Sequence, residues 1–251
     1  MPKAAGVLHD GQSAQPRARR GRPRKADADA ARNAVLDAAE ALFAQHGLHG
    51  VTLREVARAA GVDGALLHYY FDTKRGLFDA VFLRRAEVLN TARMQALNAY
   101  EAAKGDGVSV EGALRAFLGP VLGAAATGDP GWLNYCSLIA QVSNTPEWGG
   151  EAMARFFDPV VHRLLEVVRR ALPDADPADL YWSYNMLSGA LMLTISETGR
   201  LDRLSEGLCR SDDMERAQAH MIAFAAAGFR AARSSGRPAE PPDASVVVSG
   251  T

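Results

Sequence analysis

The fold is decided by one stretch, residues 51–74, which reads VTLREVARAAGVDGALLHYYFDTK. Thr52 and Glu55 have the spacing of a capping box, in which the threonine hydroxyl accepts from the glutamate amide and the glutamate reaches back. A short helix is therefore predicted to begin there, and it ends just before Gly61, because glycine adopts the left-handed conformation that turns a chain sharply. Asp63 can cap a further helix over Gly64–Phe71. The stretch predicts two short helices around a tight turn.

These two helices have the layout of a helix-turn-helix. Ala57 is a small residue four positions before Gly61, and it lets the second helix cross the first closely. Packing against a supporting helix over about residues 29–46 is predicted for Val56, Ala57, Ala60, Val62, Leu66 and Leu67. The outward face of Gly64–Phe71 would then lie in a major groove of DNA. An ordinary corner between two bundle helices is the alternative, since helical hairpins that contain glycine are common.

Apolar residues recur at intervals of three and four through most of the chain, and the alternation typical of strands is absent. We therefore predict an all-α fold, with an N-terminal three-helix helix-turn-helix domain followed by a larger helical bundle. Further helices are expected over residues 73–103, 110–127, 129–142, 145–172, 176–200 and 211–233. The expected divisions are a disordered basic arm at 1–26, the helix-turn-helix domain at 27–83, the effector-binding and dimerisation domain at 84–233, and a disordered tail at 234–251.

The formal net charge of −1 conceals an uneven distribution along the 251 residues. Against one acid, Asp10, the first 25 residues carry Lys3, Arg17, Arg19, Arg20, Arg22, Arg24 and Lys25. A basic arm on a mildly acidic body indicates a polyanionic partner, although a merely solvated tail is the alternative. The segment Arg20-Gly21-Arg22-Pro23-Arg24 is similar to a hook that lies in the minor groove, where arginine suits the narrow, negative A·T tract. Minor-groove contacts are therefore expected for Arg20, Arg22 and Arg24.

Composition and motifs exclude several classes of protein. The cysteines Cys136 and Cys209 are far apart in sequence, which argues against a disulfide scaffold or a zinc site and fits a reducing cytoplasm. Residues 1–25 lack the apolar core of a signal peptide, and the longest uncharged stretch, Leu180–Ser196, is too short and polar to span a membrane. Motifs of serine hydrolases, P-loop and dinucleotide-binding proteins and zinc proteases are absent. We expect a cytoplasmic protein with no membrane contact, catalytic residue, cofactor or metal.

The tract around the turn resembles the DNA-binding domain of the TetR family of transcriptional regulators. The matching pattern is Ala57-x3-Gly61-Val62 followed by Leu67-His68-Tyr69-Tyr70-Phe71-x2-Lys74-x2-Leu77, and the resemblance covers about residues 29–83. It implies an all-α homodimer that binds a double-stranded DNA operator through its N-terminal domain. The C-terminal domain of such a regulator binds a small effector, and effector binding typically releases the operator, as expected of a repressor.

The resemblance also implies which residues contact DNA. Positions that contact phosphates match Thr52, Tyr69 and Lys74. The position that can reach a base edge from the first helix of the motif matches Arg54. The reading face of the second helix carries Gly64, Ala65 and His68. The family usually has tyrosine at the position of His68, and neither Gly64 nor Ala65 offers a side-chain hydrogen bond. Base readout would therefore rest on Arg54, His68, close backbone approach and the basic arm.

The second half of the chain predicts an effector pocket mainly by its apolar and aromatic composition. Its segment Leu138–Pro173 is similar to the ligand domain of fatty-acid-responsive (PsrA-type) members of the family. Candidate pocket residues are Phe117, Trp132, Tyr135, Trp148, Phe156, Trp182 and Asn185. Each of these side chains would equally suit the core of the bundle. The expected effector is an apolar or amphipathic small molecule such as a fatty acid or an acyl thioester, and no acid or base stands out for a charged ligand.

The last two long helices are predicted to pair two subunits. The uncharged run Leu180–Ser196 and the small residues within 219–232 let helices approach closely across a two-fold axis, although burial within one subunit is the alternative. Two reading helices about 34 Å apart would meet successive major grooves. Two other functions remain open from the sequence: a nonspecific or architectural DNA-binding protein that relies on the basic arm, and a helical-bundle enzyme.

Overall fold

The computed structural model of the chain describes residues 25–231, without the side chains of residues 25 and 146–153. The described residues form ten α-helices, a single 3-10 turn (Gly105–Gly107) and no strand, which confirms the predicted all-α class. The α-helices are α1 (Lys25–His46), α2 (Leu53–Ala60), α3 (Gly64–Phe71), α4 (Lys74–Lys104), α5 (Val110–Ala126), α6 (Pro130–Ser143), α7 (Pro146–Ala171), α8 (Pro177–Ile195), α9 (Arg200–Leu204) and α10 (Met214–Ala231). Nowhere in residues 25–231 does a helix combine the length and apolar content needed to cross a membrane.

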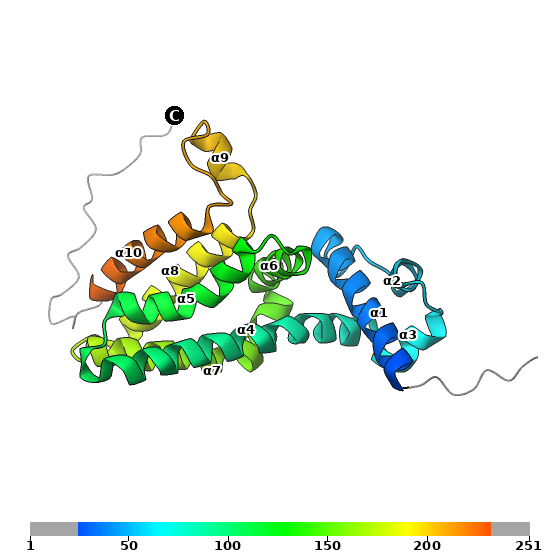
Figure 1. Ribbon diagram of the computed structural model, residues 1–251, viewed down its shortest axis with the longest axis horizontal. Helices are drawn as coiled ribbons and strands as arrows, with labels where there is room; N and C mark the ends of the chain where they lie inside the picture. The colour runs from blue at the N-terminus through cyan, green and yellow to red at the C-terminus, as the bar shows by residue number, and fades with distance from the viewer. Residues whose placement is uncertain (1–24, 232–251) are drawn as a thin grey trace, which may run out of the picture.

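Figure 1 shows a small unit of α1–α3 joined to a larger bundle by the long helix α4. Within the bundle α4 packs against α5 and α7, α10 packs against α5 and α8, and α6 contacts α1 as well as α8. The short helix α9 lies between α8 and α10 in the chain and projects outward from the bundle. The expected domain boundary at residue 83 falls inside α4, so one continuous helix belongs to both units.

Short polar residues set where the helices begin. Thr52 and Glu55 form the predicted capping box at α2, with the Thr52 amide donating to Glu55 Oε2 at 2.8 Å. Asp63 caps α3 by accepting from the Ala65 amide at 2.8 Å.

The end of α8 differs from the sequence prediction, which continued the helix to about residue 200. Positive φ angles at Glu197 and Gly199 turn the chain out of the helix and leave α9 as a separate element.

The small unit is built on α1, as the sequence predicted. The buried face of α1 carries Val35, Leu36, Ala39 and Phe43. Against it lie Val56, Ala57 and Leu67, which are buried, and Ala60 and Val62, which are half-buried. Gly61 has a φ of +67°, and the amide of the next residue donates to the Ala57 carbonyl, so the turn between α2 and α3 is the predicted left-handed one. The Tyr70 hydroxyl fastens α3 to α1 by donating to the Ala28 carbonyl at 3.1 Å.

A buried ion pair holds α1 against α4. The Glu40 carboxylate accepts from Arg84 Nη2 at 2.8 Å and from Arg85 Nε at 2.7 Å, and Arg84 also reaches the exposed Asp37. Helix α6 comes close to this pair at Gly131, where a Cβ atom would lie 1.7 Å from Arg85 Nη2. The ion pair therefore lies where α1, α4 and α6 meet.

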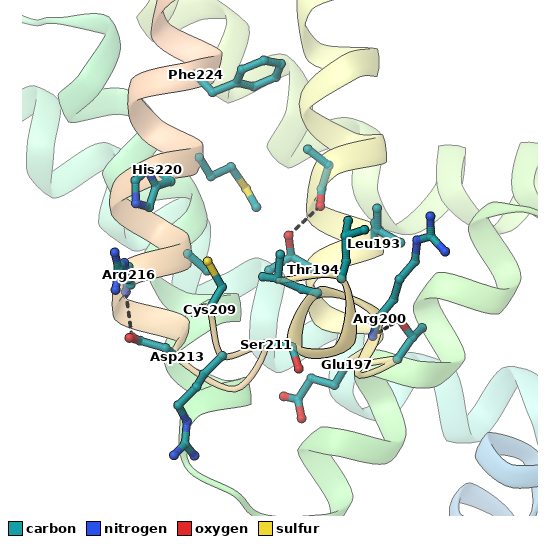
Figure 2. Close-up of a pocket in the computed structure, with 17 residues that line it drawn as sticks. Leu193, Thr194, Glu197, Arg200, Cys209, Ser211, Asp213, Arg216, His220 and Phe224 are labelled. Atoms are coloured by element: carbon teal, nitrogen blue, oxygen red, sulfur yellow. Dashed lines mark hydrogen bonds between the residues drawn. The ribbon is translucent and has the colours of Figure 1, made fainter. Parts of the chain in front are cut away.

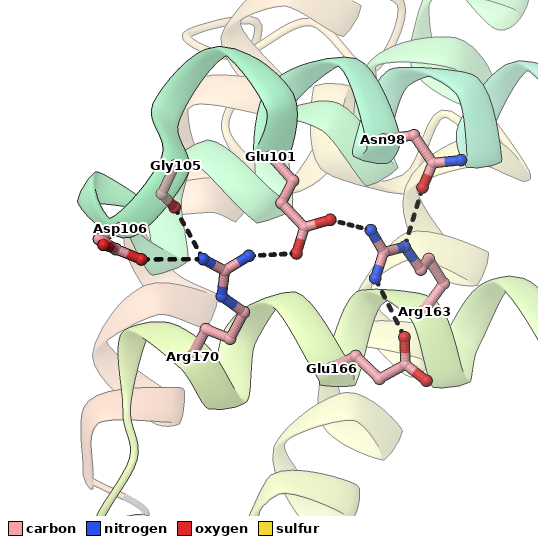
Figure 3. A network of polar contacts seen from close by, with 7 residues as sticks. All are labelled: Asn98, Glu101, Gly105, Asp106, Arg163, Glu166 and Arg170. Carbon is pink, nitrogen blue, oxygen red and sulfur yellow. Dashed lines mark hydrogen bonds and ion pairs between the residues drawn. The ribbon is translucent and has the colours of Figure 1, made fainter.

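A second network joins the far end of α4 to α7 (Figure 3). Glu101 of α4 accepts from both Arg163 and Arg170 of α7. Arg163 Nε also donates to Asn98 Oδ1 at 2.9 Å, and Arg170 donates to the carbonyl of Gly105 at 3.0 Å. The hydrogen bonds from Arg170 and Arg163 hold the pKa of Glu101 below its usual range. The network therefore fixes α4 alongside α7 over the last two turns of α4.

Candidate DNA-reading surface and effector site

Helix α3 buries one face and leaves the other open. Leu67 and Phe71 point into the core of the small unit. Of the predicted reading face, Gly64, Ala65 and His68 are exposed, and the Tyr69 side chain is 82% exposed. The alternative of an ordinary bundle corner would bury this helix on several sides, whereas α3 packs against α1, α2 and α4 of its own unit and leaves its other face exposed. The geometry leaves the whole outward face of α3 accessible to a large partner.

A hollow of about 360 Å³ lies between α2 and α3 on the same side. Its lining includes three predicted DNA contacts, Arg54, Gly64 and His68, and brings them together. It also includes Arg58, which the sequence reading did not select. Arg58 lies one helical turn after Arg54, and that spacing alone places both guanidinium groups on one face of α2. Two exposed arginines therefore border α3.

The remaining predicted DNA contacts have different surroundings. The hydroxyl of Thr52 serves the cap of α2, accepting from the Glu55 amide at 3.3 Å. Lys74 Nζ donates to the Val51 carbonyl at 3.1 Å, which ties the start of α4 to the segment before α2. An ammonium group has three donors, so two remain for a phosphate. The predicted contacts Arg20, Arg22 and Arg24 lie outside the described residues.

Four of the predicted effector residues lie in the interior of the bundle, and three of them, Trp132, Tyr135 and Phe156, form a chain of ring contacts with Phe82. Phe117 and Tyr135 are buried, and Trp132 and Phe156 are half-buried. Ring centroids of Tyr135 and Phe156 lie 5.7 and 6.3 Å from that of Phe82, and Trp132 lies 6.0 Å from Tyr135. We call this group, with Phe82, the aromatic interior. The structure does not bring Trp182 and Asn185 together with it, because both lie on the exposed face of α8. The Trp148 side chain lies outside the described residues.

The sequence reading missed a charged residue in this interior. Arg93 of α4 is 3% exposed, and its guanidinium carbon lies 4.4 Å from the centroid of the Phe117 ring. Burial lowers the pKa of Arg93 to about 10, which still leaves the group charged at neutral pH. A signal was present in the sequence, because Arg93 falls four residues after Leu89 and four before Leu97, within the apolar stripe of α4.

A separate pocket of about 680 Å³ lies between the end of α8, α9 and the first turns of α10. Figure 2 shows Leu193 and Thr194 of α8 facing His220 and Phe224 of α10 across it. None of the predicted effector residues lines it. Leu193 and Phe224 are strongly exposed, so this pocket opens onto the outer surface of α8 and α10.

Comparison with protein families matches both parts of the chain. Residues 35–81 match the family of bacterial regulatory proteins described as the tetR family. Residues 115–228 match the family described as tetracyclin repressor-like, C-terminal domain. The first match covers the second half of α1, α2, α3 and the first turns of α4, and the second covers most of α5 and the helices from α6 to α10. Together the two matches extend over more than half of the chain.

Similar proteins agree with these matches. The repressor KstR2 of Rhodococcus jostii is 40% identical over 50 residues, and the regulator RutR of Escherichia coli is 44% identical over 52 residues. Those segments are 20% and 21% of this chain and only 24% of each relative, so the matched stretch spans about a quarter of the relatives' length. A solved TetR-like regulator from Rhodococcus sp. RHA1 shares the fold with a TM-score of 0.57 at 19% identity, covering 83% of this chain and 99% of that one. The regulator PfmR from Thermus thermophilus has a TM-score of 0.52 at 21% identity, covering 74% and 94%. The helix-turn-helix, the bundle and both family matches lead to one conclusion: the chain belongs to the tetR family of bacterial regulatory proteins.

Proposed function

We propose that this protein is a sequence-specific transcriptional repressor that binds a DNA operator as a homodimer and is released by a small effector. The observation that carries the proposal is the open face of α3, bordered by Arg54 and Arg58 and braced from behind by α1. A reading helix must be rigid on one side and accessible on the other to enter a major groove. Such a protein acts where the DNA is, so we expect it in the cytoplasm.

Contacts to DNA would divide between two roles. Arginine donates two parallel hydrogen bonds to guanine, so Arg54 and Arg58 are suited to base edges or phosphates beside α3. Tyr69 presents its hydroxyl outward at the end of α3, where a phosphate contact would set the register of the helix. Gly64 leaves open space at its Cα, which lets the backbone of α3 come close to the bases.

Dimerisation would use the outer faces of α8 and α10. Large apolar side chains stand exposed there: Tyr181, Trp182, Met186, Leu193 and Phe224. A group of exposed apolar side chains of this kind on neighbouring helices is typical of an interaction site. Gly189 of α8 and Gly228 of α10 have nothing within 4 Å of a would-be Cβ, so packing within the subunit does not require them. Small residues at exposed positions allow the helices of a second subunit to approach closely.

An effector in the aromatic interior would reach α1 through α6. Tyr135 and Trp132 lie one turn apart on α6, and the Trp132 ring lies 5.0 Å from the guanidinium of Arg85. Arg85 binds the buried carboxylate of Glu40 on α1, and Gln141 of α6 donates to a backbone carbonyl of α1 at 3.0 Å. A ligand that shifts α6 would therefore shift α1 and, with it, the spacing of the two reading helices.

Selection of bound sites from random duplexes tests DNA reading directly. We expect a palindromic site, with affinity that falls steeply as salt rises because phosphates are neutralised on binding. Replacing both Arg54 and Arg58 by alanine should abolish the preference for that site, whereas Arg115→Ala, an exposed arginine on the remote helix α5, should leave it unchanged. Enrichment of no sequence by the unaltered protein would refute the proposal.

Removal of residues 1–25 separates a regulator from a nonspecific DNA-binding protein. A regulator that reads through α3 should bind more weakly without its arm and keep its sequence preference. Loss of both binding and preference would favour the nonspecific or architectural alternative, in which the arm does all of the binding.

A further inference from the structure

The aromatic interior contains an arginine with no counter-charge. Arg93 is 3% exposed, and no acidic side chain of the described residues forms an ion pair with it. Its Nε donates to the Phe117 carbonyl at 3.1 Å, and its guanidinium lies over the Phe117 ring. The other two guanidinium nitrogens have no acceptor among the described residues. Burying a charge without a partner is costly, so a buried guanidinium in this state is an unusual component of a core.

The ionisable groups nearest to Arg93 cannot supply the missing negative charge. They are Tyr135, Cys136 and Tyr184. Burial raises the pKa of both tyrosine hydroxyls, and it raises the pKa of the Cys136 thiol to about 11. All three therefore keep their protons at neutral pH. Among the described residues, the groups that act electrostatically on Arg93 include no carboxylate, and its acceptor is the Phe117 carbonyl.

A second buried donor interacts electrostatically with the arginine. The Tyr135 side chain is 1% exposed, and its hydroxyl makes no hydrogen bond to any described residue. A buried hydroxyl without a hydrogen-bond partner destabilises a folded protein. Phenylalanine at position 135 would avoid this cost if the hydroxyl had no ligand to bind. Arg93 and Tyr135 thus combine a cation with a free hydroxyl donor, and both groups suit the two oxygens of a carboxylate.

We propose that Arg93 and Tyr135 bind the carboxylate of a small effector whose apolar body lies among Phe82, Trp132 and Phe156. The proposal rests on the function proposed above and names the chemical class of its effector: a monocarboxylate with an aliphatic or aromatic body. It favours a free acid over an acyl thioester, because the thioester group itself has no anionic oxygen to place against a guanidinium inside the bundle. It also places the anion on α6, the helix that contacts α1.

Matched pairs of acids and esters test this class on the full-length protein without DNA. Isothermal titration calorimetry with decanoate and methyl decanoate examines an aliphatic body, and 2-naphthoate and methyl 2-naphthoate examine an aromatic one. In at least one pair we expect the acid to bind at least about tenfold more tightly than its ester, as charge-assisted hydrogen bonds imply. Which pair shows the preference tells whether the body of the ligand is aliphatic or aromatic. Equal binding, or no binding, of acid and ester in both pairs would overturn the proposal.

Three variants locate the carboxylate. Arg93→Met should lower the affinity for the preferred acid at least about tenfold and leave that for its ester unchanged. Tyr135→Phe should weaken acid binding several-fold while the melting temperature stays the same or rises. Arg216→Met, in the pocket between α8 and α10, is the control and should change neither. Loss of acid binding in Arg216→Met, or full binding in Tyr135→Phe, would refute the site. Should Arg93→Met fail to fold, Tyr135→Phe decides alone.

The outcome is independent of operator binding. A protein that selects an operator but binds no acid would keep its proposed function and lose this inference. A protein that binds the acid through Arg93 but selects no DNA sequence would do the reverse.

Discussion

Replacing the buried Glu40 by glutamine should weaken the attachment of α1 to α4. The Glu40 side chain is 3% exposed and accepts three hydrogen bonds, one from Arg84 and two from Arg85, at 2.7–2.9 Å. Removing one partner of a buried ion pair costs about 3–5 kcal/mol. Arg84 and Arg85 retain 28% and 20% exposure, so water can partly solvate them, and the glutamine oxygen still accepts one bond. We therefore expect a loss of about 2–3 kcal/mol in the free energy of unfolding.

Urea unfolding followed by far-ultraviolet circular dichroism measures this loss. The protomer concentration is held fixed, because the stability of the proposed dimer would depend on it. Asp37→Asn is the matched control, since Asp37 binds the same Arg84 at 2.7 Å from one turn earlier on α1. Its side chain is 67% exposed, so its removal should cost less than about 1 kcal/mol. Equal losses in the two variants would refute the idea that burial makes the Glu40 ion pair the main connection between the units.

Three further outcomes are expected. Gly61→Ala should lower the free energy of unfolding by about 1–2 kcal/mol in urea, because the φ of +67° is unfavourable for alanine although there is space for its Cβ atom. Gly64→Ala also has space and no positive φ, so it should cause no such loss, and a similar loss in both variants would contradict the left-handed turn. Met186→Glu places a charge on the proposed dimer interface and should halve the mass measured by light scattering. Val88→Glu, at an equally exposed site on α4, should leave the dimer intact. A dimeric Met186→Glu variant would exclude the α8 face as the dimer interface. Because its arginine partners lower the pKa of Glu101 in the folded protein, its contribution is present above the ordinary glutamate pKa of about 4.3 and is lost as pH falls through the folded value. The stability difference between the unaltered protein and Glu101→Gln should therefore shrink below about pH 4, and a difference that persists to about pH 2 would contradict this.

Local signals explain why the helix-turn-helix was predictable from the sequence. The capping box at Thr52 and the glycine at 61 act through neighbouring backbone groups only, so their spacing is enough to place α2 and α3. The end of α8 depended on a weaker signal. The sequence offers Gly199 as a stop, but the turn begins earlier, at Glu197, a residue type that rarely adopts a positive φ.

The site residues were harder to predict because they depend on which face of each helix is buried. Trp182 and Phe117 are both large aromatics on uncharged stretches, yet Phe117 is in the core and Trp182 faces outward. Composition cannot separate these cases, because an interface between subunits has the same apolar character as a core. Arg93 was missed for the opposite reason: it is a single arginine on a long helix that carries many charged residues, so its residue type alone does not mark it as buried.

The length of α4 has a mechanical consequence. With 31 residues, the helix acts as a stiff rod about 46 Å long at a rise of 1.5 Å per residue. A tilt of only about 5° at one end would displace the opposite end by about 4 Å, more than a hydrogen bond to a base tolerates. A movement too small to reorganise the bundle can therefore be magnified into a mismatch with the groove spacing of DNA.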